Sequence, residues 1–181
     1  MKLNQIANHL KQYYNNADDA VQVILKHAGI AAGACAVGIA FPALEVPAII
    51  VASFGAVWAM YIQLCKCLGI ELSDNLLKVL ASAAISNITI NLASAYALEV
   101  VASMLPGIGH ITGTVLTFSC VYLAGMMFMS LLLALAKNGQ KIEEMSEEEL
   151  KSALREQTPT KEDMKDAKTA FKCEPKTAEA E

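Results

Sequence analysis

Residues 100–135 read VVASMLPGIGHITGTVLTFSCVYLAGMMFMSLLLAL, without a single Lys, Arg, Asp or Glu. From Ile111 onward this stretch is long enough to cross a bilayer, because a spanning helix needs about 20 apolar residues. A helix that is apolar on every side has no face for water, and a soluble domain of this size rarely contains one. The stretch therefore predicts an all-α membrane protein organised around this last hydrophobic helix.

The charged residues are distributed unevenly along the chain. Residues 1–136 contain five basic and six acidic residues, whereas residues 137–181 contain nine basic and twelve acidic ones. A nearly charge-free body is thus followed by a short, highly charged tail. Neither part is basic, which argues against nucleic-acid binding.

Four uncharged segments are candidate membrane spans, so the fold is predicted to be polytopic with about four hydrophobic helices. Pro42, Glu45 and Pro47 mark a turn between the first two segments, which are expected to form a helical hairpin. The first segment is short, and it is either a full span or a re-entrant wedge. The expected spans are residues 28–44, 46–65, 79–98 and 111–136.

The hydrophobic domain is expected to cover residues 28–136, between an N-terminal arm and a tail. Residues 1–27 have apolar residues at helical spacing and predict an amphipathic helix on the membrane surface or against the body. The Asn and Asp residues in Asn15-Asn16-Ala17-Asp18-Asp19 are expected to divide this helix. Residues 137–181 are predicted to form a charged, partly disordered tail. Within it, Ser146-Glu147-Glu148-Glu149 has the pattern of a capping box that starts a short helix, and a second helix is expected over Thr160–Lys172. Earlier in the chain, Ser73 or Asp74 is the expected N-cap of the helix that contains the third span.

The positions of the basic residues predict the orientation. With four spans, the N-terminal arm, the 66–78 loop and the tail share one side, which then holds all 14 Lys and Arg residues. Cytoplasmic segments carry the Lys and Arg excess in membrane proteins. Both termini are therefore expected to face the cytoplasm.

Four short segments follow one another in a recognisable order. They are Phe41-Pro42 to Val46-Pro47, Cys67-Leu68-Gly69-Ile70-Glu71-Leu72-Ser73, Leu105-Pro106-Gly107-Ile108-Gly109 and the Glu-rich helix Ser146–Gln157. This order resembles an uncharacterised bacterial helical membrane domain that often follows a small-GTPase domain. The resemblance implies an all-helical module of unassigned activity in the bacterial inner membrane. The chain has no G-x-x-x-x-G-K-[ST] sequence, so nucleotide chemistry is not implied.

Small residues at regular spacing predict close helix packing. In a bilayer such spacing lets helix backbones approach one another, because packing replaces the hydrophobic driving force between helices. We therefore expect a homo-oligomer assembled through these faces. The candidate helix-packing residues are Gly29, Gly33, Gly38, Gly109 and Gly113.

A polar face is expected on the third hydrophobic helix. Asn87, Asn91 and Ser94 are spaced so that they share one side of a helix. An amide in hydrocarbon is costly unless it is hydrogen-bonded, so these side chains should meet other helices or water. Either they form interhelical hydrogen bonds, or they line a polar pathway.

No arrangement of residues points to catalysis. The five cysteines suggest neither a disulfide framework nor a zinc site, and Cys65-Lys66-Cys67 lacks histidines nearby. Glu99 and His110 bracket a helix break and are expected to be solvated. The cluster Met126, Met127 and Met129 is typical of adaptable packing. The sequence thus predicts no enzyme, no cofactor and no metal.

Two functions agree with this sequence. The first is a self-assembling membrane scaffold or interaction module, which contacts the lipid bilayer and offers its tail to a cytoplasmic protein partner. The alternative is an oligomeric channel or transporter with the pathway lined by Asn87, Asn91 and Ser94. A weaker third hypothesis is a helical protein that changes between soluble and inserted forms.

Overall fold

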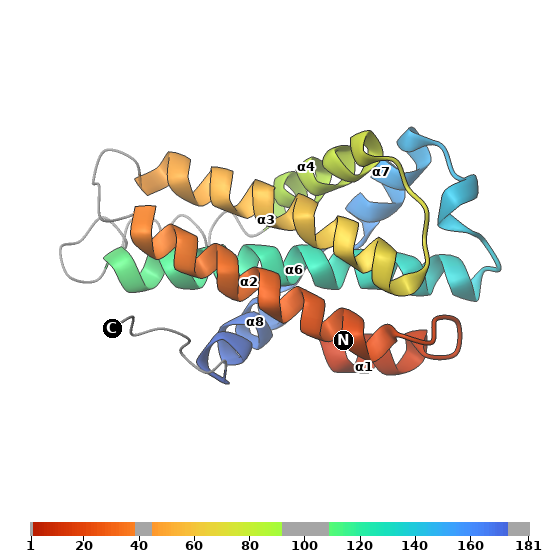
Figure 1. Cartoon of the computed structure of the whole chain (residues 1–181), viewed down its shortest axis with the longest axis horizontal. Helices are drawn as coiled ribbons and strands as arrows, with labels where there is room; N and C mark the ends of the chain where they lie inside the picture. Colours follow the sequence, from red (N-terminus) through yellow and green to blue (C-terminus); the bar gives the residue numbers. More distant parts are fainter. Residues whose placement is uncertain (1, 39–44, 92–108, 174–181) are drawn as a thin grey trace.

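The computed structural model of this chain describes residues 2–38, 45–91 and 109–173. These residues form helices only, with no strand among them, and the predicted all-α class is confirmed for this part of the chain (Figure 1). The elements are α1 (Leu3–Leu10), α2 (Ala17–Gly38), α3 (Glu45–Leu68), α4 (Asp74–Asn91), α6 (Gly109–Lys137), the short 3-10 helix η2 (Ile142–Glu144), α7 (Glu147–Glu156) and α8 (Lys161–Cys173).

Helix α6 lies at the centre of the fold and contacts α1, α2, α3, α4, α7 and α8. Helices α2 and α3 form a hairpin that packs along it, so α3 runs in the same direction as α6 and α2 in the opposite one (Figure 1). Residues Val121–Met129 of α6 are all buried. The lack of a polar face on α6 explains this position, because a helix apolar on all sides is stable in water only when other elements enclose it.

The contact between α3 and α6 combines aromatic packing with one buried hydrogen bond. The ring of Tyr61 stacks on that of Phe128 with centroids 4.6 Å apart. The Tyr61 hydroxyl donates to the carbonyl of Ala124 at 3.0 Å, which supplies the partner that a buried phenol needs. Burial of Tyr61 therefore leaves no unsatisfied hydroxyl.

The contact between α2 and α6 depends on Gly125. A Cβ atom at Gly125 would lie 2.7 Å from Cγ1 of Ile24 and 2.9 Å from its Cδ1. Ile24 is fully buried, so its branched side chain has little room to move. Glycine is thus required at position 125 for this close approach of two helices.

Several local predictions are confirmed. The N-terminal arm is divided, with α1 ending at Leu10 and α2 beginning at Ala17. The Ser73 hydroxyl accepts the N–H of Leu76 at 3.3 Å at the start of α4. The Ser146 capping box forms, since the hydroxyl accepts the N–H of Glu149 at 3.3 Å and the Ser146 N–H donates to the Glu149 carboxylate at 2.8 Å.

One feature differs from the expected organisation. Helix α2 continues without a break across residues 27 and 28, where a boundary between an amphipathic arm and a membrane domain was expected. Helices α7 and α8 form in the tail, and they pack on α4 and α6. The amphipathic pattern of both helices supplies the reason. Their apolar residues Leu150, Leu154, Met164 and Ala167 are buried against the central helices. The part of the tail expected to be disordered, residues 174–181, lies outside the described residues.

The polytopic arrangement is not confirmed. Among the described residues, one helix segment, Gly113–Lys137, is long and apolar enough to cross a membrane. Its most apolar 18-residue window is 89% buried inside the protein. A mostly buried core helix of a soluble protein has the same length and composition, so this segment by itself does not show a membrane span.

Replacing Gly125 tests the packing of α2 on α6. We expect Gly125→Ala to lower the free energy of unfolding by about 1–3 kcal/mol, because an added methyl group in a filled core forces its neighbours apart. The measurement is urea unfolding followed by circular dichroism. The matched control is Gly33→Ala in α2, where an added Cβ meets nothing within 4 Å. The control should gain about 0.5–1 kcal/mol from better helix propensity. Equal stability of the two variants would contradict the packing described.

Candidate functional site

The most distinctive surface lies at one end of the α2–α3–α6 bundle. There the last turns of α2, the first turns of α3 and the first turns of α6 meet (Figure 1). We call residues 28–38, 45–57 and 109–117 the apolar end. These ranges contain no Lys, Arg or Asp, and the only Glu is Glu45 at the start of α3.

Small and aliphatic residues are exposed on the described part of α2 at the apolar end. Ile30 on α2 is 57% exposed. Gly33, Ala34 and Ala36 on α2 and Gly55 on α3 are exposed as well. Another exposed aliphatic residue, Ile90, lies at the end of α4, outside the apolar end. The exposed face of α2 is therefore an uncharged surface that another apolar phase or molecule can cover.

The candidate helix-packing glycines lie in different environments. Gly113 is buried on α6 and Gly29 is half-buried on α2. Gly33 is exposed, with open space around the position of a Cβ atom, so it makes no close helix contact inside the chain. The surroundings of Gly38 and Gly109 lie outside the described side chains. The glycine that does permit a close contact, Gly125, was not among those predicted, because its neighbours in sequence have no small-residue spacing.

Asn87 and Asn91 form part of the contact between α4 and α7. Asn87 is 5% exposed, and its Nδ2 donates to the carbonyl of Arg155 at 2.9 Å and to that of Leu154 at 3.5 Å. The last carbonyls of an α-helix lack partners within the helix. Asn87 gives two of those in α7 a donor from α4, in addition to the Gln157 N–H and the Thr158 hydroxyl. Asn91 in turn donates to the Asn87 carbonyl at 2.9 Å and to its side-chain oxygen. Ser94 lies outside the described residues.

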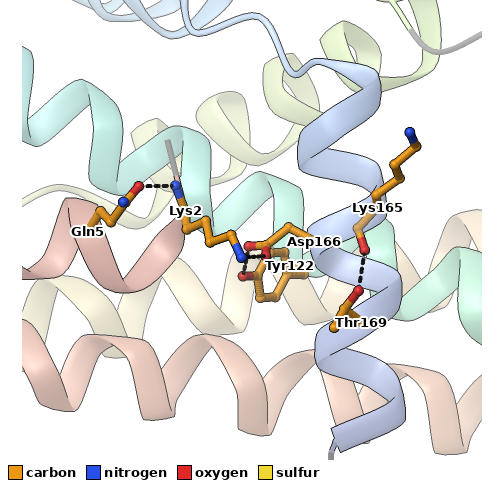
Figure 2. Close-up of polar contacts among 6 residues, drawn as sticks. All are labelled: Lys2, Gln5, Tyr122, Lys165, Asp166 and Thr169. Carbon is orange, nitrogen blue, oxygen red and sulfur yellow. Dashed lines mark hydrogen bonds and ion pairs between the residues drawn. The ribbon is translucent and has the colours of Figure 1, made fainter.

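A cluster of polar residues connects α1, α6 and α8 (Figure 2). The hydroxyl of Tyr122, at the middle of α6, donates to Asp166 Oδ2 on α8 at 2.9 Å. Lys2, just before α1, places its Nζ 3.7 Å from Asp166 Oδ1. Tyr122 is only 4% exposed, so its hydrogen bond to a carboxylate contributes roughly 1.5–3 kcal/mol. The Lys2 side chain is 75% exposed, so its ion pair adds at most about 1 kcal/mol.

The cysteines near the end of α3 are poorly suited to chemistry. Burial, together with the nearby Glu143 carboxylate, raises the pKa of the Cys65 thiol to about 12. Burial also raises the pKa of Cys67, with a contribution from Asp19. Thiolates are the nucleophiles and metal ligands, so the raised pKa values leave both groups mostly protonated at neutral pH. Among the described residues, no group of three or more His, Cys, Asp or Glu side chains is arranged to hold a metal ion.

The remaining candidates have plain packing roles or lie outside the described part. Met126, Met127 and Met129 are buried in the core around α6. Glu99 lies outside the described residues, and of His110 only the backbone is described. No protein-family model, curated protein or solved structure matches this chain. The resemblance to a bacterial membrane domain stays a prediction.

Replacing Asn87 tests its role at the α4–α7 contact. We expect Asn87→Leu to lower the free energy of unfolding by about 0.5–1.5 kcal/mol, because α4 loses the Nδ2 donor that joins it to the Arg155 and Leu154 carbonyls of α7. Hydrogen exchange at the amides of Leu150 and Leu154 should accelerate at the same time. The matched control is Ser86→Ala, an exposed position on the same helix, which should leave both quantities unchanged. Unchanged exchange in Asn87→Leu would contradict the role described.

Proposed function

We propose that this protein is a non-enzymatic membrane module that attaches to the bilayer through its apolar end and self-associates there as a scaffold. The observation that carries the proposal is the exposure of Ile30 and of small residues on a surface almost free of charge. Lipid is the partner that this surface fits best. It offers hydrocarbon to the aliphatic groups and requires no complementary charges.

The distribution of charge supports one orientation. Every Lys and Arg of the chain lies outside the apolar end. The opposite end holds exposed charged groups, including the ion pair between Lys11 Nζ and Asp18 at 2.7 Å. In a membrane-attached protein the Lys- and Arg-rich part faces the cytoplasm. We therefore propose a cytoplasmic location for both termini. The resemblance to a bacterial inner-membrane domain agrees with this arrangement.

The proposal requires shallow insertion only. Helix ends that carry apolar side chains can enter the interface of a bilayer without crossing it. The four-span arrangement remains a prediction from the sequence, and α6 is the one described helix that has the length and composition for a span. A bacterial inner-membrane origin also remains a proposal, which membrane fractionation of the native host would test.

The scaffold function is better supported than the channel function. A channel lined by Asn87, Asn91 and Ser94 needs free amide groups along its pathway. The amide of Asn87 instead donates to α7, and that of Asn91 donates to Asn87. The exposed face of α2 around Gly33 offers a close-packing surface for a second copy in the bilayer.

Introducing a charge at the apolar end tests membrane attachment. We expect Ile30→Glu to reduce binding to phosphatidylcholine–phosphatidylglycerol vesicles at least tenfold, about 1.4 kcal/mol, because a carboxylate is excluded from the apolar phase. The measurement is vesicle flotation. The matched control is Tyr13→Glu, since Tyr13 is exposed at the opposite end of the molecule and its replacement should leave binding unchanged. Equal binding of both variants would exclude attachment through this end.

Enlarging Gly33 tests self-association separately. We expect Gly33→Leu to shift the protein extracted from vesicles toward smaller assemblies in analytical ultracentrifugation, because a bulky side chain separates helices that meet at this face. Gly33→Ala is the control and should retain the assembly, since Ala is small enough for close helix contacts. Gly33 is exposed, and a Cβ atom there meets no atom within 4 Å, so the substitution does not disturb packing inside the chain. Identical distributions for the Leu and Ala variants would show that another surface holds the copies together.

A further inference from the structure

Helix α8 lies across the middle of α6. Its C-terminal half meets α6 at Phe118, whose ring contacts that of Phe171 edge-on with centroids 5.2 Å apart. The Asp166 carboxylate meets Tyr122 one turn further along α6. The segment before α8 reaches Met126, Met127 and Ser130, with which it lines a cavity of about 230 Å³. Together these contacts cover the central part of the segment that is able to cross a membrane.

The outer face of α8 carries charges that α6 lacks. The side chain of Lys165 extends away from α6 (Figure 2). Lys161, Glu162 and Lys172 are exposed as well. Charged side chains at the centre of a bilayer are strongly disfavoured. Helix α8 therefore cannot stay docked at this position while α6 lies in the hydrocarbon of a membrane.

Helix α8 is attached to α6 by apolar packing and by a hydrogen bond. Two of its apolar residues, Met164 and Ala167, are buried, and Ala170 and Phe171 are half-buried. The hydrogen bond from Tyr122 to Asp166 adds to this packing, and Lys2 supports it from α1. The apolar part of this contact can be replaced by lipid, because both surroundings are apolar.

Helix α8 also caps its own N-terminus. The hydroxyl and the N–H of Thr160 donate to the Asp163 carboxylate at 2.7 and 2.8 Å. The Thr160 hydroxyl accepts the N–H of Asp163 at 3.2 Å in return. Because the first turn is satisfied by residues of the same segment, no group of α6 is needed to start this helix. An amphipathic helix of this kind can persist on a membrane surface after it leaves the protein.

We propose that α8 is a releasable cover of α6. It remains docked in water and leaves α6 when the protein binds a bilayer, so that lipid replaces it against Phe118 and Tyr122. The inference rests on the proposed function, since release is coupled to attachment at the apolar end. It adds a conformational step that separates a shallowly bound form from a deeply inserted one.

A chemical link between α8 and α1 tests this step. Cys173 at the end of α8 and Asn4 on α1 line one cavity of about 220 Å³. In a chain carrying Asn4→Cys and Cys67→Ser, a short bis-maleimide therefore connects Cys173 to residue 4 and holds α8 in place. The same chain with the native Asn4, treated identically, is the matched control, since only Cys173 then reacts at this cavity.

The readouts separate attachment from insertion. With phosphatidylcholine–phosphatidylglycerol vesicles, both proteins should float. Only the control should resist alkaline carbonate extraction, with at least a fivefold larger resistant fraction.

Two results would overturn the proposal in distinguishable ways. Equal carbonate resistance of linked and unlinked protein would show that α8 does not control insertion, while the proposed function survives. If neither protein floats with the vesicles, the proposed membrane attachment is wrong, and the proposal that α8 is a releasable cover is wrong as well.

A second variant needs no chemical link. Tyr122→Phe removes the hydroxyl that holds Asp166 and should speed conversion to the carbonate-resistant form severalfold. Tyr13→Phe, at an exposed tyrosine, should leave the rate unchanged. Equal rates for the two variants would contradict the role of the Tyr122–Asp166 hydrogen bond in holding the cover.

Discussion

The rest of the structure depends on the enclosure of α6. This helix presents apolar side chains in every direction, so water must be excluded around its whole circumference. Helices α2 and α3 supply long apolar contacts along it, and α4 fills part of the remaining side. The shorter helices α1, α7 and α8 complete the enclosure with one apolar and one polar face each. The charged helices therefore serve to make a very apolar helix compatible with water.

Specific polar contacts lie where helices meet. The Tyr61 hydroxyl reaches a backbone carbonyl of α6, Asn87 reaches the last carbonyls of α7, and Tyr122 reaches a carboxylate on α8. Apolar packing alone tolerates small shifts of one helix along another. A buried donor that must find its acceptor selects one register, because an unpaired polar group in the interior is costly. These bonds therefore define how the helices align, and the apolar contacts supply most of the stability.

The same arrangement connects stability with the proposed function. An apolar helix enclosed by amphipathic helices can exchange its protein surroundings for lipid, because both environments keep its apolar side chains out of water. In the proposed function, contact with lipid begins at the apolar end without any change in the fold. In the proposed cover mechanism, insertion is a separate step that follows the release of α8.

The local structure could be predicted from the sequence to a large extent. The extent of α6, the Ser73 cap, the Ser146 capping box and the division of the N-terminal arm all follow from nearby residues. The number of spans could not be predicted in this way. A long apolar segment shows that a helix must be kept out of water. Burial inside a protein and insertion in lipid both exclude water, so the length of the segment does not distinguish between them. The role of Asn87 was also left open, since its acceptors on α7 are far away in the sequence.

The sequence by itself determined that this protein is helical, that its central helix must be shielded from water, and where several helices begin. These properties depend on residues within a few turns of one another, where periodicity and capping act directly. Only the tertiary structure decided which elements provide the shielding. It placed the charged helices α7 and α8 on the hydrophobic ones, made Gly125 the close contact with Ile24, and left Gly33 at the surface. The physical reason is that an amphipathic pattern shows that one face of a helix must be covered by apolar groups, but it does not show which element covers it. That element is selected by how the whole chain packs.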